Sequence, residues 1–121
     1  MRMIITKSTP FTLSEIEELK EQFHFYIKTV IDIDSKTCSA GMDRHFEGEQ
    51  ILLREDSKQA NIWGGGIDLN TKEIDYNSFI NIRSNDNNTK NEIQSEEIKR
   101  KYKELTEYFF KDVLWVILDY S

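Results

Sequence analysis

The chain has 121 residues, a length that suits one domain and is too short for two full ones. Its formal net charge of −6 argues against partners with a phosphate surface, so we expect neither nucleic acid nor a membrane as a partner. Cys38 is the only cysteine, which excludes an intramolecular disulfide and a CxxC zinc site and is typical of the reducing cytoplasm.

The N-terminal part predicts a short strand followed by an amphipathic helix. Met3 to Thr6 is apolar and fits an edge strand. Thr12 and Glu15 have the spacing of a capping box, in which each side chain satisfies a backbone N–H of the other residue. Apolar residues then recur three and four positions apart, which predicts a helix that ends near Tyr26.

From Thr29 onward the apolar period changes to two, which predicts strands. The strand candidates are the segments 29–34, 37–42, 50–54, 61–69 and 74–83. The spacers between them are too short for crossover helices, so we expect antiparallel pairing. The predicted fold is a single α+β domain, 1–121, whose antiparallel sheet of about five strands carries an N-terminal and a C-terminal helix.

The last third of the chain predicts a flexible polar loop over residues 85–94 and a helix over residues 95–120. The loop is rich in Asn and Asp and has nothing apolar to bury before its end, while Ser95 is a suitable helix N-cap. From Val113 to Leu118 apolar residues surround the predicted helix, although this run is too short to span a membrane. This end of the helix is therefore expected either in the core or against a partner.

Several short motifs occur together in a recognisable order. They are the segment 29–34, GxxxH at 41–45, LLxEDSxQ at 52–59, IWG at 62–64 and INIR at 80–83. Taken together, from about residue 12 to about residue 105, the chain resembles a family of small uncharacterised microbial proteins known only as a domain of unknown function. The resemblance implies no particular activity, because the family has no established one.

One candidate site consists of Asp43, His45, Glu47 and Glu49, which alternate along the sequence. If this segment is extended, all four side chains project from one face and could hold a divalent metal such as manganese, iron or zinc. His45 is also the candidate for general acid–base catalysis, since its imidazole titrates nearest neutrality. The alternative, which we prefer, is that Gly48 breaks the strand, the acids line a solvated loop, and the protein has no cofactor.

A second candidate site lies on the last predicted strand, 74–83. Arg83 shares a strand face with Asn81, and a guanidinium beside a carboxamide can grip a carboxylate or a phosphate. The alternative is an ion pair inside the protein, with Asp56, Glu55 or an acid near His45.

A third group, Asp56, Ser57 and Gln59 before Trp63, could form the rim of a pocket with an aromatic floor. The run Gly64 to Gly66 lacks the Lys-Ser/Thr of a phosphate-binding loop and is more typical of a bulge or of close backbone packing.

Two hypotheses about function follow, and neither establishes whether the protein is an enzyme. In the first, residues from one side of the sheet bind a small anionic or polar ligand: His45, Asp56, Ser57, Gln59, Trp63, Asn81 and Arg83. In the second, the protein is a non-catalytic interaction module that forms a homodimer through its apolar C-terminal helix, with Trp115 and Tyr120 as anchors.

Overall fold

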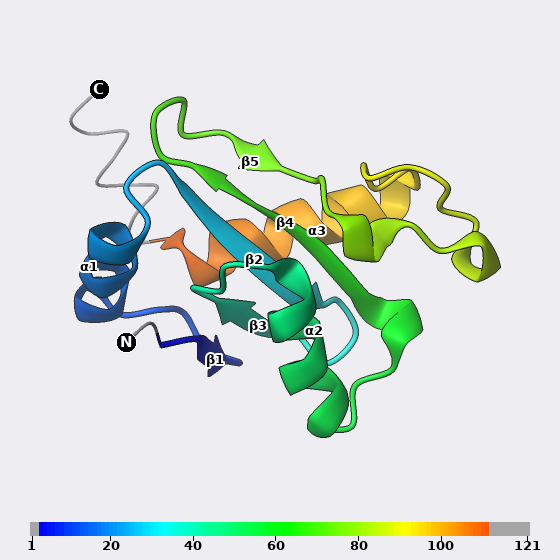
Figure 1. Ribbon diagram of the computed structural model, residues 1–121, viewed down its shortest axis with the longest axis horizontal. Helices are drawn as coiled ribbons and strands as arrows, with labels where there is room; N and C mark the ends of the chain where they lie inside the picture. The colour runs from blue at the N-terminus through cyan, green and yellow to red at the C-terminus, as the bar shows by residue number, and fades with distance from the viewer. Residues whose placement is uncertain (1–2, 112–121) are drawn as a thin grey trace.

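The computed structural model describes residues 3–111 and contains a five-stranded antiparallel sheet with helices on both faces (Figure 1). The strands are β1 (Ile5–Lys7), β2 (Tyr26–Asp32), β3 (Thr37–Ala40), β4 (Ile62–Asp68) and β5 (Ile74–Asp75). Their order in the sheet is β1-β3-β2-β4-β5, and every neighbouring pair is antiparallel. These observations confirm the predicted α+β class.

The described helices are α1 (Leu13–Gln22), α2 (His45–Arg54) and α3 (Glu96–Phe109), together with three short 3₁₀ turns. The turns are η1 (Gln59–Asn61), η2 (Phe79–Asn81) and η3 (Ser84–Asp86). α1 begins with the predicted capping box: the Glu15 N–H donates to Thr12 Oγ1 at 3.2 Å, and the Thr12 N–H donates to Glu15 Oε1 at 2.8 Å. The helix ends at Gln22 rather than near Tyr26, because Tyr26 already belongs to β2.

The segment 50–54, predicted as a strand, is instead the second half of helix α2. Its buried residues are the adjacent Gly48 and Glu49 and, one helical turn later on the same face, Leu52. Only Leu52 of these is a large apolar residue, so the face that packs on the sheet carries little of the hydrophobic signal from which a helix is predicted. Helices are therefore not confined to the two ends of the chain.

The segment 74–83, predicted as one long strand, forms a strand only at Ile74–Asp75. Beyond it, Asn77 makes an isolated bridge to Glu92, and the chain turns through η2 and η3. The predicted sharing of one strand face by Asn81 and Arg83 is therefore wrong, because residues 79–81 form a 3₁₀ turn.

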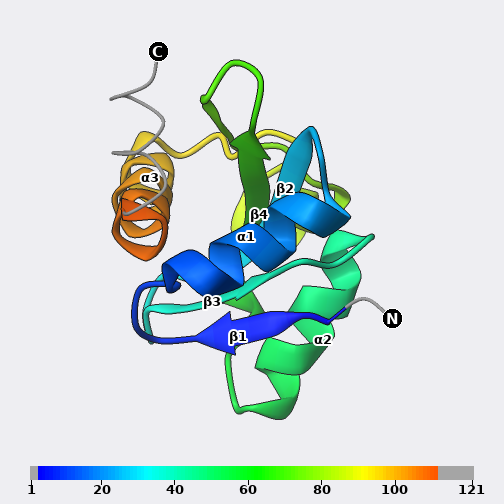
Figure 2. The same cartoon turned by 90° about the vertical axis from the view of Figure 1, so that its left-hand side faces the viewer.

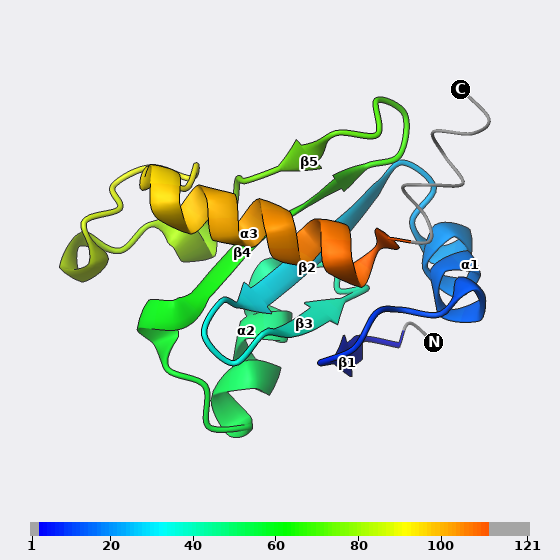
Figure 3. The same ribbon diagram turned by 180° about the vertical axis from the view of Figure 1, so that it is seen from behind.

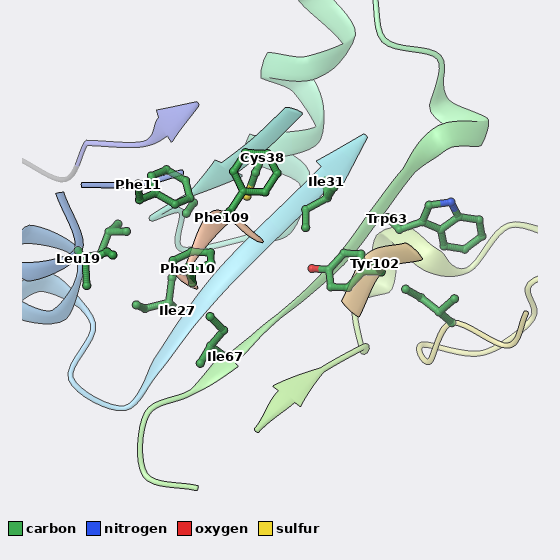
Figure 4. Close-up of a cluster of buried hydrophobic side chains, with 13 residues drawn as sticks. Phe11, Leu19, Ile27, Ile31, Cys38, Trp63, Ile67, Tyr102, Phe109 and Phe110 are labelled. Atoms are coloured by element: carbon green, nitrogen blue, oxygen red, sulfur yellow. The ribbon is translucent and has the colours of Figure 1, made fainter. Parts of the chain in front are cut away.

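The larger hydrophobic core lies between the sheet and the helices α1 and α3. Tyr102 and Phe109 of α3, Leu19 of α1 and Trp63 of β4 are all buried there (Figure 4). Figure 3 shows α3 crossing this face of the sheet from end to end. The Tyr102 hydroxyl reaches the Thr29 side chain at 2.5 Å and so satisfies a polar group inside the core.

A smaller core lies on the opposite face, beneath α2 (Figure 2). It contains Val30, Met42, Leu52 and Ile62. A Cβ on Gly48 would lie 2.6 Å from Met42 Cε and 2.9 Å from Val30 Cγ2. Gly48 thus allows α2 to approach the sheet closely, a role different from the strand break predicted for it.

The loop over residues 85–94 buries more than its sequence indicates. Asn88 is 2% exposed, and its side-chain amide donates to the carbonyl oxygens of Asn81, Lys90 and Glu92. The C-terminal helix is described as far as Phe109, so the predicted apolar end, Val113 to Leu118, lies outside the described residues. Over residues 3–111, the helices lack the combination of length and hydropathy needed to cross a bilayer.

Candidate functional site

The ligand site predicted from His45 and Arg83 is divided between the two faces of the sheet. His45 lies over Gly64, where its Cδ2 would be 3.1 Å from a Cβ on that residue. Arg83 stacks on the Trp63 ring, with its guanidinium carbon 4.2 Å from the ring centroid. Trp63 and Gly64 are consecutive on β4 and therefore project to opposite faces. The two side chains do not converge on one small ligand.

Arg83 is held by the protein itself. Its Nη1 donates to the backbone oxygens of Gln59 at 2.7 Å and Ile62 at 2.8 Å, and its Nε lies 3.0 Å from Asp86 Oδ2. Burial lowers the pKa of Arg83, while the nearby carboxylates of Asp86 and Glu49 oppose that shift. The predicted alternative of an internal ion pair therefore describes Arg83 better, although the partner at ion-pair distance is Asp86 rather than Asp56 or Glu55.

Asn81 takes the place of a neighbouring strand along the edge of β4. It is fully buried, its Oδ1 accepts from the Gly64 N–H at 2.9 Å, and its Nδ2 donates to the Gly64 oxygen at 2.9 Å. The same Nδ2 also donates to the backbone oxygens of Tyr76 and Asn91. Asn81 thus satisfies backbone groups that the short strand β5 leaves without a partner.

Asp56 and Ser57 line a polar hollow of about 200 Å³ that includes Asn61, the residue before β4, and does not include His45. Asp32 and Lys58 line it as well. Burial opposes ionisation of Asp32, but hydrogen bonds from the Ser57 hydroxyl and from the N–H groups of Ser35 and Asp34 outweigh it and lower the pKa. Ser57 therefore stabilises a buried carboxylate of the fold.

The predicted metal site loses its geometric basis, because its segment is helical where an extended chain was required. Asp43 precedes α2, and Glu47 turns back so that its Oε1 accepts from the Arg44 N–H at 2.9 Å. Residues two apart on a helix point in different directions, so Glu47 cannot share a face with His45 and Glu49. Within residues 3–111, the structure contains no group of three or more side chains placed to hold a metal ion.

A different site emerges between α2 and η2, which contact each other across the face of β4. We call it the α2–η2 cleft; it has a volume of about 440 Å³. Its lining residues are Lys28, Asp43, Arg44, His45, Phe46, Ser78, Phe79 and Ile80. A Cβ on Gly64 would lie 2.8 Å from Ser78 Cβ, so this glycine allows η2 and His45 to close over the strand.

His45 enters the cleft from the first turn of α2 with a fixed tautomer. Its Nε2 lies 2.7 Å from the Gly65 carbonyl oxygen, which can only accept, so Nε2 carries the proton. Burial lowers the pKa of His45, and Lys28 lowers it further, while the bond to Gly65 and the carboxylate of Asp75 oppose the shift. The imidazole is therefore neutral near pH 7, and its Nδ1 is a hydrogen-bond acceptor.

The cleft combines two cations, Lys28 and Arg44, and one carboxylate, Asp43, with exposed aromatic rings. Among residues 3–111, no carboxylate lies within ion-pair distance of Lys28 or Arg44. Lys28 instead lies over the Tyr26 ring, with Nζ 5.7 Å from its centroid. Phe79 is 83% exposed and Phe46 is 49% exposed. The sequence predicted only His45 and Asp43 of this site; the exposed phenylalanines gave no signal, because an aromatic residue in a sequence is expected in the core.

No curated protein and no solved structure matches the chain. A family model described as "Protein of unknown function (DUF5674)" matches residues 3–109. The match includes the segments that carry the predicted resemblance and confirms it at the level of a family of unknown function. The chain belongs to the DUF5674 family.

Proposed function

We propose that this protein binds a small anionic ligand in the α2–η2 cleft. The observation that carries the proposal is the placement of Lys28 and Arg44, two cations without an ion-pair partner among the described residues, in one apolar-walled cleft. The chain as a whole carries a net charge of −6, so positive charge concentrated at a concave site is informative.

The dimensions of the cleft support a small molecule as the ligand. A volume of about 440 Å³ lies within the range of small-molecule sites, which are usually concave, largely apolar and equipped with a few polar groups. Ser78 and His45 provide such groups. A nucleic-acid strand is a poor candidate because the rest of an acidic protein would repel its phosphates. With its lone thiol Cys38 buried and free, the protein suits the reducing cytoplasm.

A titration with inorganic phosphate, followed by NMR, tests this proposal. Lys28→Met keeps the length of the side chain and removes its charge, so phosphate should bind about tenfold more weakly. Arg44→Met should have an effect in the same direction. Lys101→Met is the matched control, because Lys101 lies on α3 and pairs with Glu97 at 3.3 Å. Equal phosphate affinity in all four proteins, or no binding by the native chain, would contradict the proposal.

Self-association through the C-terminal helix remains a separate prediction. Its anchors, Trp115 and Tyr120, lie outside the described residues, so the prediction still depends on sequence alone. Sedimentation of the full chain at high concentration tests it: a homodimer that dissociates in a Trp115→Ala variant would support it, and a strictly monomeric protein would contradict it.

A further inference from the structure

The α2–η2 cleft presents three kinds of chemistry to a ligand, of which an inorganic anion uses only one. Lys28 and Arg44 provide the positive charge. Phe46, from α2, and Phe79, from η2, line the same cleft with exposed rings. His45 provides a neutral acceptor, because the Gly65 carbonyl fixes the proton on the other ring nitrogen.

Phe46 and Phe79 are exposed phenylalanines that line the cleft, whereas the exposed Phe25 does not. Phe79 is 83% exposed, although burial of an aromatic side chain stabilises a fold. It belongs to a 3₁₀ turn whose other residues are held tightly, since Asn81 is buried and Ser78 caps the turn by accepting from the Ile80 N–H at 3.2 Å. The turn therefore presents Phe79 outward on a fixed backbone, as a stacking surface requires.

The acceptor on His45 restricts the ligand further. Its Nδ1 has no hydrogen-bond partner among the described residues, whereas its Nε2 is occupied. The lone pair on Nδ1 would repel a hydrogen-bond acceptor of the ligand, whereas it would accept a hydrogen bond from a ligand N–H.

The next step rests on the proposed anion site: we propose that the ligand of the α2–η2 cleft is a nucleoside monophosphate. Its phosphate lies with Lys28 and Arg44, its base stacks on Phe46 or Phe79, and an N–H of the base donates to His45 Nδ1. A mononucleotide combines an anion, a flat ring and a ring-borne donor within a volume that the cleft of about 440 Å³ accommodates.

Calorimetric titration of the full chain with the 5′-monophosphates of adenosine, guanosine, cytidine and uridine, and with ribose 5-phosphate, tests the inference. At least one nucleotide should bind on the order of tenfold more tightly than ribose 5-phosphate, because stacking of a base adds to the phosphate contacts. If every nucleotide binds only as tightly as ribose 5-phosphate, the inference is overturned while the anion site stands. If none of these ligands binds, both fail.

Variants at two phenylalanines locate the effect. Phe79→Ala should reduce nucleotide affinity to near that of ribose 5-phosphate and leave the binding of ribose 5-phosphate unchanged. Phe25→Ala is the matched control, because Phe25 is 68% exposed and does not line the cleft. Equal loss of nucleotide affinity in both variants, or in neither, overturns the stacking role of Phe79.

The contribution of His45 is tested from the side of the ligand. The best-bound nucleotide is compared with an analogue in which every N–H hydrogen of the base is replaced by a methyl group, so that the base has no donor but the ring and the phosphate remain. We expect a loss of about tenfold, since the His45 acceptor is then left without a partner inside the cleft. Equal affinity for the two ligands would overturn the recognition of an N–H by His45.

Discussion

At the scale of single residues, the hydrogen bond from Ser57 to Asp32 has a measurable consequence for stability. Asp32 is 2% exposed, and its Oδ1 also accepts from the N–H groups of Asp34 at 2.9 Å and Ser35 at 3.0 Å. These bonds outweigh the effect of burial and lower the pKa of Asp32. The resulting stability is present above the unfolded-state pKa of about 3.9 and is lost as the pH falls through the lower folded-state value.

Ser57→Ala removes one of those hydrogen bonds. We expect it to lower the free energy of unfolding by about 1–2 kcal/mol at pH 7, because the bond is made to a charged group. The cost should be smaller at pH 3 than at pH 7, because a larger fraction of Asp32 is protonated as the pH falls and the bond to a neutral carboxyl is weaker. Urea unfolding at both pH values measures the effect, and the same substitution in an Asp32→Asn background is the control. A cost that is equal at both pH values would show that the carboxylate is not involved.

The candidate residues show how far a sequence identifies a site. Ser57, Asn81 and Arg83 have side chains that can recognise a ligand, and each makes polar contacts in the structure. Those contacts are with a buried carboxylate, with the edge of β4 and with backbone oxygens of the chain itself. A polar side chain has the same chemistry whether it meets a ligand or the backbone of its own protein, so residue type alone could not distinguish the two.

At the scale of elements, the close approach of α2 to the sheet depends on Gly48. Gly48→Ala would gain about 1 kcal/mol from helix propensity. The added Cβ would lie 2.9 Å from Cγ2 of Val30, a β-branched side chain with little freedom to move, and so the clash should outweigh that gain.

We therefore expect Gly48→Ala to destabilise the protein by about 1–2 kcal/mol, measured by denaturant unfolding. Val30→Ala in the same background supplies the control, because it removes the methyl groups that the new Cβ meets. The Gly48→Ala change should then cost less. A stabilising Gly48→Ala would mean that α2 moves away from the sheet without a penalty.

The elements that were predicted well have strong local signals. α1 has a capping box and a regular apolar stripe, and β2 has β-branched residues at a period of two. α2 has neither signal, since His45, Gly48 and Glu49 occupy its inner face beside Leu52. β5 is much shorter than predicted, because the Asn81 side chain makes the hydrogen bonds to Gly64 that a longer edge strand would make. No local pattern in the sequence encodes this tertiary contact.

At the scale of the whole molecule, two hollows among residues 3–111 are each lined by several carboxylates. Four carboxylates line the hollow that also contains Ser57: Asp32, Asp34, Glu55 and Asp56. Another four line a hollow of about 260 Å³ beside β5: Asp68, Glu73, Asp75 and Glu92. The described ion pairs on the outer face of α3 are exposed, including Arg100–Glu104, and such pairs contribute little to stability.

Repulsion between these carboxylates should therefore dominate the response to salt. Raising NaCl from about 20 mM to about 300 mM shortens the Debye length from about 20 Å to about 6 Å, and we expect the Tm to rise by at least about 2 °C. Asp56→Asn should raise the Tm at low salt and reduce the further rise with NaCl, since Asn tolerates the φ of +71° at this position. Calorimetry on both proteins makes the comparison. A Tm that falls as salt is added would mean that the ion pairs outweigh the repulsion, and the acidic hollows would then be a minor influence on the stability of the fold.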